Sequence, residues 1–179
     1  MAAQEDETPT VHLPVIQHQW RPPEHDYFKV NFDAAVFKSL NLVGIGVVIR
    51  DWRGDVVAAL SMPTALASTV VDLEALACHH AMLFAAEKDL QNVIFERDSI
   101  SIINAIVQDN PVLTSHGDIV DNIRFLVSIF QSFQFVFVHW SCNVVANALA
   151  KKAKCLVGYR EWLGDLPSDI SQLLDFDVP

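Results

Sequence analysis

The chain contains three apolar stretches that only a few residues separate from one another, at 28–36, 42–50 and 55–61. Connections this short can join neighbouring strands only in antiparallel order, because a parallel pair needs a crossover of a dozen or more residues. In the first stretch, apolar and polar residues alternate, which is typical of a strand with one buried face. A tight turn around Gly54 precedes the third stretch. The sequence therefore predicts a three-stranded antiparallel meander.

Helix and strand patterns alternate in the rest of the chain. Residues 68–90 are rich in Ala and Leu and lack Gly and Pro, which predicts a long helix. Because this helix precedes the apolar stretch 92–96, that stretch is expected to run parallel to a strand of the meander. Later patterns predict helices at 98–109, 115–131 and 143–156 and a strand at 133–140. The order βββαβααβα predicts an α/β fold with a mixed five-stranded sheet, the meander plus two parallel strands, flanked by helices.

The net charge of −10 belongs to the two ends of the chain. Residues 1–27 hold five acidic residues and one basic residue, and residues 161–179 hold five acidic residues and no basic one. The part between them is close to neutral, so it would repel a polyanion only modestly. Paired prolines exclude a helix just before the first strand. We expect a flexible acidic lead at 1–27, one domain at 28–175 and a short tail at 176–179.

Several features concern the compartment of the protein. No apolar run reaches the length of a membrane-spanning helix, and the acidic N-terminus lacks the apolar core of a signal peptide. Cys78, Cys142 and Cys155 are expected to be free thiols. The sequence therefore predicts an intracellular protein of the cytoplasm or nucleus that is not secreted and has no membrane partner.

Three acidic residues occupy positions with apolar neighbours. Asp33 ends the first predicted strand, although aspartate is depleted in strands. Glu74 lies within the apolar stripe of the long predicted helix, and Asp98 follows the strand after that helix, where sites form in open α/β sheets. Each also has a purely structural interpretation. These are a solvated strand end for Asp33, an arginine pair for Glu74 and a helix N-cap for Asp98.

The three carboxylates can meet if the first and fourth strands are neighbours. Asp33 and Asp98 would then emerge at the same edge of the sheet, and Glu74 could reach them from the helix between. Carboxylates this close repel one another, and a hard cation such as Mg²⁺ relieves that repulsion. The arrangement suggests phosphoryl chemistry in which two metal ions clamp an in-line displacement.

Five segments carry a resemblance to a known family: "KVNFDAAV", "GIGVVIRDWRGDVVAA", "DLEALACHHAM", "VIFERDSISIINAI" and "NVVANALAKKA". Their order and spacing resemble the plant type 1 ribonuclease H-like domain that often accompanies retrotransposon reverse transcriptases. The resemblance covers about residues 28–175. It implies the ribonuclease H-like fold and an endonuclease that cleaves the RNA strand of RNA–DNA hybrids with two Mg²⁺ ions, for which Mn²⁺ can substitute.

The resemblance also implies a set of catalytic metal ligands. Asp33, Glu74 and Asp98 match three acidic ligands of the family. The fourth belongs in the last helix, where the family has aspartate and "NVVANALA" places Asn147. Because Asn147 is neutral, one ion would lose a charged ligand.

Three further positions are candidate contacts to nucleic acid. Ala34 follows the first aspartate, where the family often has a glycine that lets the nucleic-acid backbone approach. Lys151 and Lys152 lie in the last turns of the final predicted helix. They can complement the helix dipole or contact phosphates, and the sequence favours neither role over the other.

Histidine and cysteine residues give weaker signals. "HWSCN" leaves almost no room for the loop that carries a catalytic histidine in bacterial and cellular relatives, so His139 is interpreted as structural. Cys78, His79 and His80 are consecutive and would point around a helix, so no zinc site is expected.

Two functions stay open. The first is a nuclease acting on RNA–DNA hybrids or other nucleic acid without reading base edges. The second is a domesticated module for binding or interaction, weakly active or inactive, because a fold does not imply a function. Three intact acidic residues favour the nuclease, whereas Asn147 and the absence of a basic protrusion favour the module.

Overall fold

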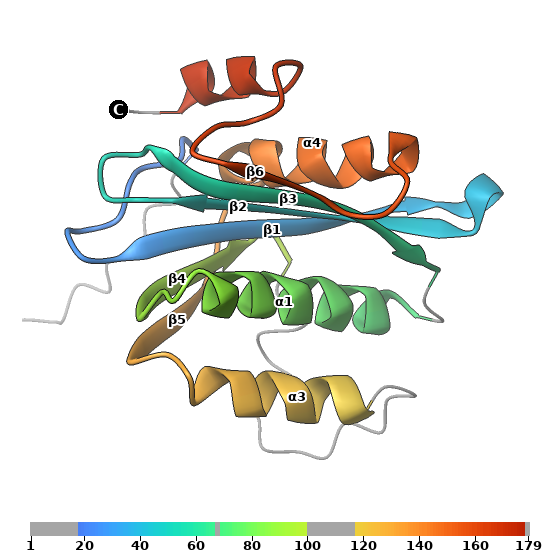
Figure 1. The fold of residues 1–179 in the computed structure, drawn as a ribbon, viewed down its shortest axis with the longest axis horizontal. Helices are drawn as coiled ribbons and strands as arrows, with labels where there is room; N and C mark the ends of the chain where they lie inside the picture. Colours follow the sequence, from blue (N-terminus) through green and yellow to red (C-terminus); the bar gives the residue numbers. More distant parts are fainter. Residues whose placement is uncertain (1–17, 67–68, 100–116, 178–179) are drawn as a thin grey trace, which may run out of the picture.

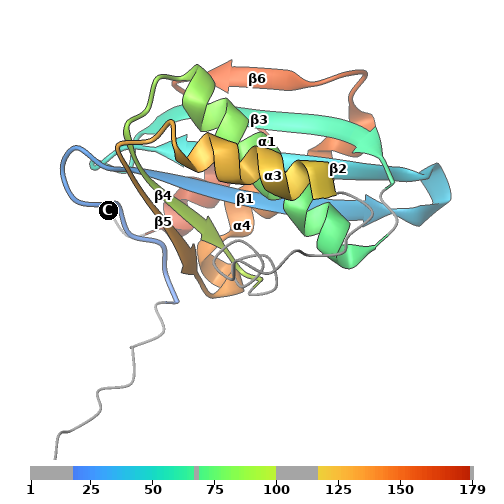
Figure 2. The same cartoon turned by 90° about the horizontal axis from the view of Figure 1, so that it is seen from below.

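A six-stranded sheet with the order β5-β4-β1-β2-β3-β6 forms the centre of the computed structural model, which describes residues 18–66, 69–99 and 117–177 (Figure 1). The strands are β1 (Phe28–Phe37), β2 (Leu42–Arg50), β3 (Val56–Ala65), β4 (Asn92–Arg97), β5 (Ser132–Phe137) and β6 (Arg160–Leu163). Helices α1 (Val70–Glu87) and α3 (Gly117–Val127) cover one face, and α4 (Val144–Lys152) covers the other. Figure 2 shows α1 and α3 in front of the sheet.

The pairing of the strands confirms the predicted topology. β1, β2 and β3 form the antiparallel meander, and β4 runs parallel to both β1 and β5. One strand was not predicted: β6 adds to the outer edge of β3 in antiparallel order, so the sheet has six strands rather than five. This strand spans only Arg160–Leu163 and carries no alternating apolar pattern from which it could be recognised.

Two predicted boundaries changed near β5. The strand expected at 133–140 ends at Phe137, and His139 instead precedes a short 3-10 helix, Trp140–Cys142. The helix expected at 115–131 is α3, which spans Gly117–Val127. The helix expected at 98–109 lies outside the described residues except for its first two positions. None of the described helices is long and apolar enough to cross a membrane.

Side chains alternate between the two faces of β1 and thereby separate the apolar core from the polar residues. Val30 and Phe32 are buried in the larger hydrophobic cluster, which α1 and α3 help to form. Asn31 and Asp33 point to the opposite face, because successive side chains of a strand alternate. That face packs against α4, where a smaller cluster includes Leu149.

Two glycines in β2 let α4 approach the sheet closely. A Cβ atom at Gly46 would lie 2.2 Å from the Ala146 carbonyl oxygen, and one at Gly44 would lie 2.0 Å from the Ala150 carbonyl oxygen. Real Cβ atoms do not approach carbonyl oxygens this closely, so any larger residue would push the helix away. Gly46 pairs with Asp33 across the β1–β2 ladder, and the close contact therefore brings α4 next to Asp33.

Both ends of the described chain pack onto the sheet. Trp20, within the lead expected at 1–27, is 2% exposed, and its ring centroid lies 3.4 Å from the Arg50 guanidinium carbon. Asp177, within the tail expected at 176–179, forms an ion pair with the same arginine. Residues on both sides of the range 28–175 therefore contact the sheet. The first seventeen residues of the lead lie outside the described residues.

Candidate active site

Asp33 and Asp98 lie where β1 and β4 separate. The parallel pairing of these strands ends at Asn31 and Glu96, and each aspartate follows two residues after its strand's last paired residue. The expectation that the two strands are neighbours is therefore confirmed. Asp33 is 8% exposed, and burial is the main cause that raises its pKa, with repulsion from Asp98 adding to the effect. The two carboxylates are thus close enough to interact.

Asn147 contacts Asp33 directly. The Asn147 amide nitrogen Nδ2 donates a hydrogen bond to Asp33 Oδ2 at 2.7 Å, and the Ala34 backbone N–H donates one to Asp33 Oδ1 at 2.8 Å. Both bonds favour the ionised carboxylate and partly offset the effect of burial on its pKa. The structure therefore brings two of the four residues that the resemblance implies into direct contact, and the amide of Asn147 donates to Asp33.

Glu74 reaches the same edge of the sheet from α1. It is 5% exposed, and Ser99 Oγ donates a hydrogen bond to its Oε1 at 2.5 Å. Its second oxygen, Oε2, is buried and accepts no hydrogen bond. A buried carboxylate oxygen without a donor is costly, so a ligand that covered it would stabilise the protein.

Arg97 is a site residue that sequence reasoning missed. It is the last residue of β4 and is 5% exposed. Its Nη1 donates a hydrogen bond to the Glu74 carbonyl oxygen at 3.2 Å, and its Nη2 lies 3.9 Å from Glu74 Oε1. The arginine pair considered as a structural role for Glu74 therefore exists. The signal was visible as "ERDS", but only the strand register shows that Arg97 points towards α1.

Asn143 was also missed. It is buried just before α4, and its Nδ2 donates hydrogen bonds to the Phe32 carbonyl oxygen at 3.1 Å and to Asp98 Oδ1 at 3.3 Å. Its Oδ1 is buried without a hydrogen-bond partner. Asn143 precedes the helix as an N-cap would, yet its side chain makes no capping bond. Instead it ties Asp98 to β1.

The donor atoms at this edge fit a hard divalent cation in kind. Carboxylate oxygens of Asp33, Glu74 and Asp98 and amide oxygens of Asn143 and Asn147 are the ligands that Mg²⁺ prefers. In the present conformation they do not converge: no three His, Cys, Asp or Glu side chains of the described residues form a group that could hold a metal ion. Asp33 is turned to Asn147, whereas Glu74 is turned to Ser99. The unpartnered Oε2 of Glu74 is the atom that a cation would satisfy.

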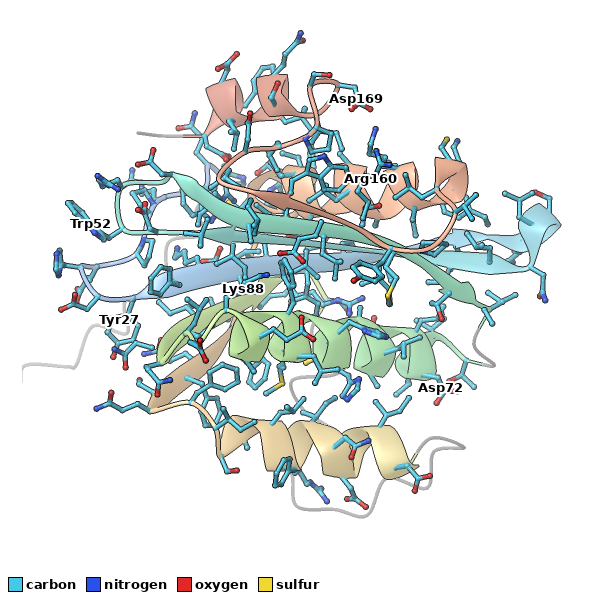
Figure 3. All side chains as sticks on the ribbon, viewed as in Figure 1. Tyr27, Trp52, Asp72, Lys88, Arg160 and Asp169 are labelled. Carbon is cyan, nitrogen blue, oxygen red and sulfur yellow. The ribbon has the colours of Figure 1, made fainter. Side chains whose placement is uncertain are left out.

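The three candidate contacts to nucleic acid differ in their surroundings. Lys152 Nζ pairs with both carboxylate oxygens of Asp169, at 2.9 and 2.8 Å, and Asp169 lies beyond α4 (Figure 3). Lys151 is exposed, and Ala34 is half-buried against the larger hydrophobic cluster. The charge of Lys152 is therefore partly compensated within the protein.

His139 has local partners. Its Nδ1 lies 2.8 Å from Ser141 Oγ and accepts a hydrogen bond from the Ser141 backbone N–H at 3.4 Å, at the start of the 3-10 helix. Its ring also lies 4.5 Å from the ring of His18. These contacts agree with a structural role.

Cys78, in α1, is fully buried, and burial raises the pKa of its thiol to about 12.

Residues 31–153 match the family model described as "Reverse transcriptase-like", so more than half of the chain is covered. The chain belongs to this family. The matched range contains all four candidate metal ligands and both lysines of α4. No curated protein matches the chain.

Solved structures of ribonucleases H resemble this reverse transcriptase-like chain in fold. RNase H1 of the archaeon Halobacterium salinarum aligns with 22% identity over 72% of this chain and 98% of its own, with a TM-score of 0.62. The N-terminal RNase H domain of a Mycobacterium tuberculosis protein aligns with 17% identity over 71% and 92%, with a TM-score of 0.61. LC11-RNase H1, solved with an RNA/DNA hybrid, aligns with 19% identity over 73% and 99%, with a TM-score of 0.57. The ribonuclease H-like fold is therefore established.

Proposed function

We propose that this protein is a divalent-metal-dependent nuclease that cleaves the RNA strand of RNA–DNA hybrids, of the plant, retrotransposon-associated type that its sequence resembles. The observation that carries the proposal is the placement of Asp33 and Asp98 at the point where β1 and β4 separate. Glu74, with a buried oxygen that lacks a partner, lies at the same edge. A buried carboxyl whose pKa is raised, as that of Asp33 is, and a buried carboxylate oxygen without a partner are typical of functional sites.

In this proposal each residue at this edge of the sheet has a role. Asp33, Glu74 and Asp98, with the amide oxygen of Asn147, would hold Mg²⁺ or Mn²⁺. When bound, the metal supplies Lewis-acid activation of water and charge stabilisation at the leaving oxygen. The Ala34 N–H and the Asn147 amide orient the Asp33 carboxylate. Asn143 holds Asp98 against β1.

The proposed substrate class has support from the structural relatives. LC11-RNase H1 and a foamy viral protease–reverse transcriptase were both solved in complex with an RNA/DNA hybrid. Recognition in our proposal depends on the shape of the hybrid and its backbone, so cleavage would be largely independent of base sequence.

A binding module without appreciable turnover is the second candidate function. Asn147 replaces a charged ligand, Arg97 adds a positive charge beside Glu74, and Lys152 is paired with Asp169. Each of these features weakens either metal binding or phosphate binding. The module hypothesis therefore predicts that nucleic acid is bound weakly or through another surface, and that no strand is cut.

Cleavage of a labelled RNA–DNA hybrid in Mg²⁺ or Mn²⁺ tests the proposal. The protein should cut the RNA strand, chelation of the metal should stop the reaction, and Asp33→Asn should lower the rate by about 100-fold or more, as is usual for loss of a group that acts in the transition state. Asp89→Asn, at an exposed residue with φ of 55° that Asn tolerates, is the matched control and should cut normally. Hybrid binding without any cleavage would favour the module.

The variant Asn147→Asp tests the assignment of the fourth position. It exchanges an amide for a carboxylate of nearly the same shape, so it should strengthen metal binding and raise the cleavage rate at low Mg²⁺ by about tenfold to a hundredfold. Without metal the new carboxylate would face Asp33 across the present 2.7 Å contact, and the variant should unfold more easily than the natural protein. An unchanged dependence on Mg²⁺ would show that position 147 holds no ion.

A further inference from the structure

Arg97 is a buried cation that lies beside the candidate acidic residues. It is anchored by α1, because its Nη1 donates a hydrogen bond to the Glu74 carbonyl oxygen at 3.2 Å. Its guanidinium carbon also lies 5.4 Å from the centre of the Phe32 ring. The backbone and an aromatic ring thus hold the positive charge in place, whatever the Glu74 carboxylate does.

The guanidinium of Arg97 offsets the negative charge of Glu74 without forming a hydrogen bond to either carboxylate oxygen. Nη2 lies 3.9 Å from Glu74 Oε1, which is too long for a hydrogen bond but close enough for strong attraction between charges. Oε2 of Glu74 accepts no hydrogen bond, and Arg97 Nε has no partner either. A pair that served structure alone would be expected to close into a bidentate contact, in which both oxygens accept hydrogen bonds. Arg97 therefore leaves one oxygen of Glu74 available to a ligand.

Charge at this edge of the sheet has an unusual balance. Three carboxylates, those of Asp33, Glu74 and Asp98, carry three negative charges. In the pattern that the sequence resembles, a fourth aspartate makes four, which two divalent ions neutralise. Here Asn147 removes one of these charges and Arg97 offsets another, so that two negative charges remain. One divalent ion would neutralise these two negative charges.

We propose that the site binds a single divalent ion and that Arg97 supplies, beside Glu74, the positive charge that a second ion would otherwise bring. The inference rests on the proposed function, since it takes these carboxylates to be the ligands of an ion. In this arrangement Arg97 is a positioning residue: it sets how many ions the site accepts and leaves Oε2 of Glu74 available to the single ion.

Counting the Mn²⁺ ions bound per chain tests this inference without any measurement of activity. Equilibrium dialysis of the full chain, with free Mn²⁺ measured by electron paramagnetic resonance, gives both the number of ions and their affinity. The natural protein and Asn147→Asp should each bind one ion. Arg97→Met, which keeps a buried unbranched chain but removes the charge, should bind its first ion about tenfold more tightly. The double variant Arg97→Met with Asn147→Asp should bind two ions.

Two controls separate local charge from net charge. Arg53→Met removes the same unit charge from an exposed turn between β2 and β3 and should leave the number and affinity of the ions unchanged. Arg97→Lys keeps a positive charge at the site and should still bind one ion. If Arg97→Met shifts Mn²⁺ affinity no more than Arg53→Met does, the guanidinium has only a structural role and the inference is overturned.

The outcomes distinguish this inference from the proposed function. Two ions of similar affinity in the natural protein would overturn the single-ion inference while leaving the nuclease intact. One ion in the double variant would overturn the role of Arg97 alone. No Mn²⁺ bound by the natural protein would overturn both. The number of Mn²⁺ ions bound by the natural protein tests the single-ion inference even if a variant at Arg97 fails to fold.

Discussion

Two buried polar clusters lie side by side along β1 and β4, and they are built in opposite ways. The first, which we call the anchor cluster, consists of Trp20, Lys29, Asn31, Arg50, Glu96 and Asp177. The second is the candidate site around Asp33, Glu74, Arg97 and Asp98. Asn31 and Asp33 are separated by one residue of β1, and Glu96 and Asp98 are separated by one residue at the end of β4. The anchor cluster therefore lies where β1 and β4 are still paired, and the candidate site lies just beyond the end of that pairing.

The anchor cluster balances its charges. Glu96 Oε2 accepts hydrogen bonds from Trp20 Nε1 and Asn31 Nδ2, both at 3.0 Å, and its Oε1 pairs with Lys29 Nζ at 2.6 Å. Arg50 pairs with Asp177 and donates to Asn31 Oδ1 at 3.0 Å. Two acidic and two basic side chains leave no net charge, although Arg50 Nε is buried without a partner.

The candidate site keeps an excess of negative charge. Arg97 offsets only one of its three carboxylates, and Glu74 Oε2 has no partner. Burial opposes ionisation of Asp33 and raises its pKa, whereas Glu96 in the anchor cluster is held by three donors. The difference indicates that the anchor cluster stabilises the fold, while the candidate site costs stability that a bound cation would restore.

The largest expected effect comes from breaking the anchor cluster. Glu96→Ala would leave Lys29, whose side chain is 13% exposed, without its counter-charge and would remove an acceptor from both Trp20 and Asn31. We expect a loss of about 3–5 kcal/mol in the free energy of unfolding, measured by urea denaturation. Glu87→Ala, at the exposed end of α1, is the control and should change it by less than about 0.5 kcal/mol. Equal effects would mean that the cluster does not stabilise the fold.

Trp20→Ala tests whether the described part of the N-terminal lead belongs to the anchor cluster. The change removes a buried ring that stacks on Arg50 and donates to Glu96, so we expect a loss of about 3 kcal/mol in urea denaturation. Trp52→Ala removes a ring that is 44% exposed in the β2–β3 turn and should cost less than about 1 kcal/mol. If the two variants are equally stable, residues near 20 do not support the sheet.

A smaller effect of opposite sign is expected at the candidate site. Asp33→Asn removes a buried charge and its repulsion with Asp98, so it should raise the free energy of unfolding by about 1–2 kcal/mol in metal-free buffer. The same change should abolish the rise in melting temperature that millimolar Mn²⁺ gives the natural protein. A destabilised Asp33→Asn variant would place Asp33 with the anchor cluster as a structural residue.

The smallest expected effect is a dependence on pH. Because the pKa of Asp33 is raised above its unfolded value of 3.8, the native state binds this proton more tightly than the unfolded state does. The contribution of Asp33 to stability therefore rises as the pH falls through the folded pKa towards 3.8, and falls again as the pH rises.

The difference in the free energy of unfolding between the Asp33→Asn variant and the natural protein should accordingly become smaller from pH 7 to pH 4. Urea denaturation of both proteins without metal measures the gap, and the difference between them cancels the other titrating groups. A gap that widens as the pH falls would show that the pKa of Asp33 is lowered.

Local rules were enough to predict five of the six strands and the neighbourhood of the two aspartates. Connection lengths fix the meander, and the crossover helix fixes the direction of β4, so Asp33 and Asp98 could be placed at one edge from the sequence. The contact of Asn147 with Asp33 could not be predicted in this way, because it depends on how closely α4 approaches Gly46. That approach is visible in the sequence only as two glycines in an apolar strand.

The residues that were missed depend on non-local contacts. Arg97 follows Glu96 in a strand, and which of the two faces α1 is decided by pairing with β1. Trp20 follows no periodic pattern, and its burial arises from Arg50 and Glu96, which lie far away in the sequence. β6 is too short to show alternation and forms because β3 offers it an edge. Sequence reasoning finds local patterns, whereas these features come from tertiary pairing.

The two ends of the described residues meet at Arg50, and this has a mechanical consequence. Trp20 stacks on this arginine from the N-terminal side, and Asp177 pairs with it from the C-terminal side. A force applied between residues 18 and 177 would therefore peel two adjacent segments from one point instead of shearing strands along their length. Such peeling breaks contacts one after another, so the domain should yield at low force. The same proximity makes the segment 18–177 suitable for circular permutation through a short linker.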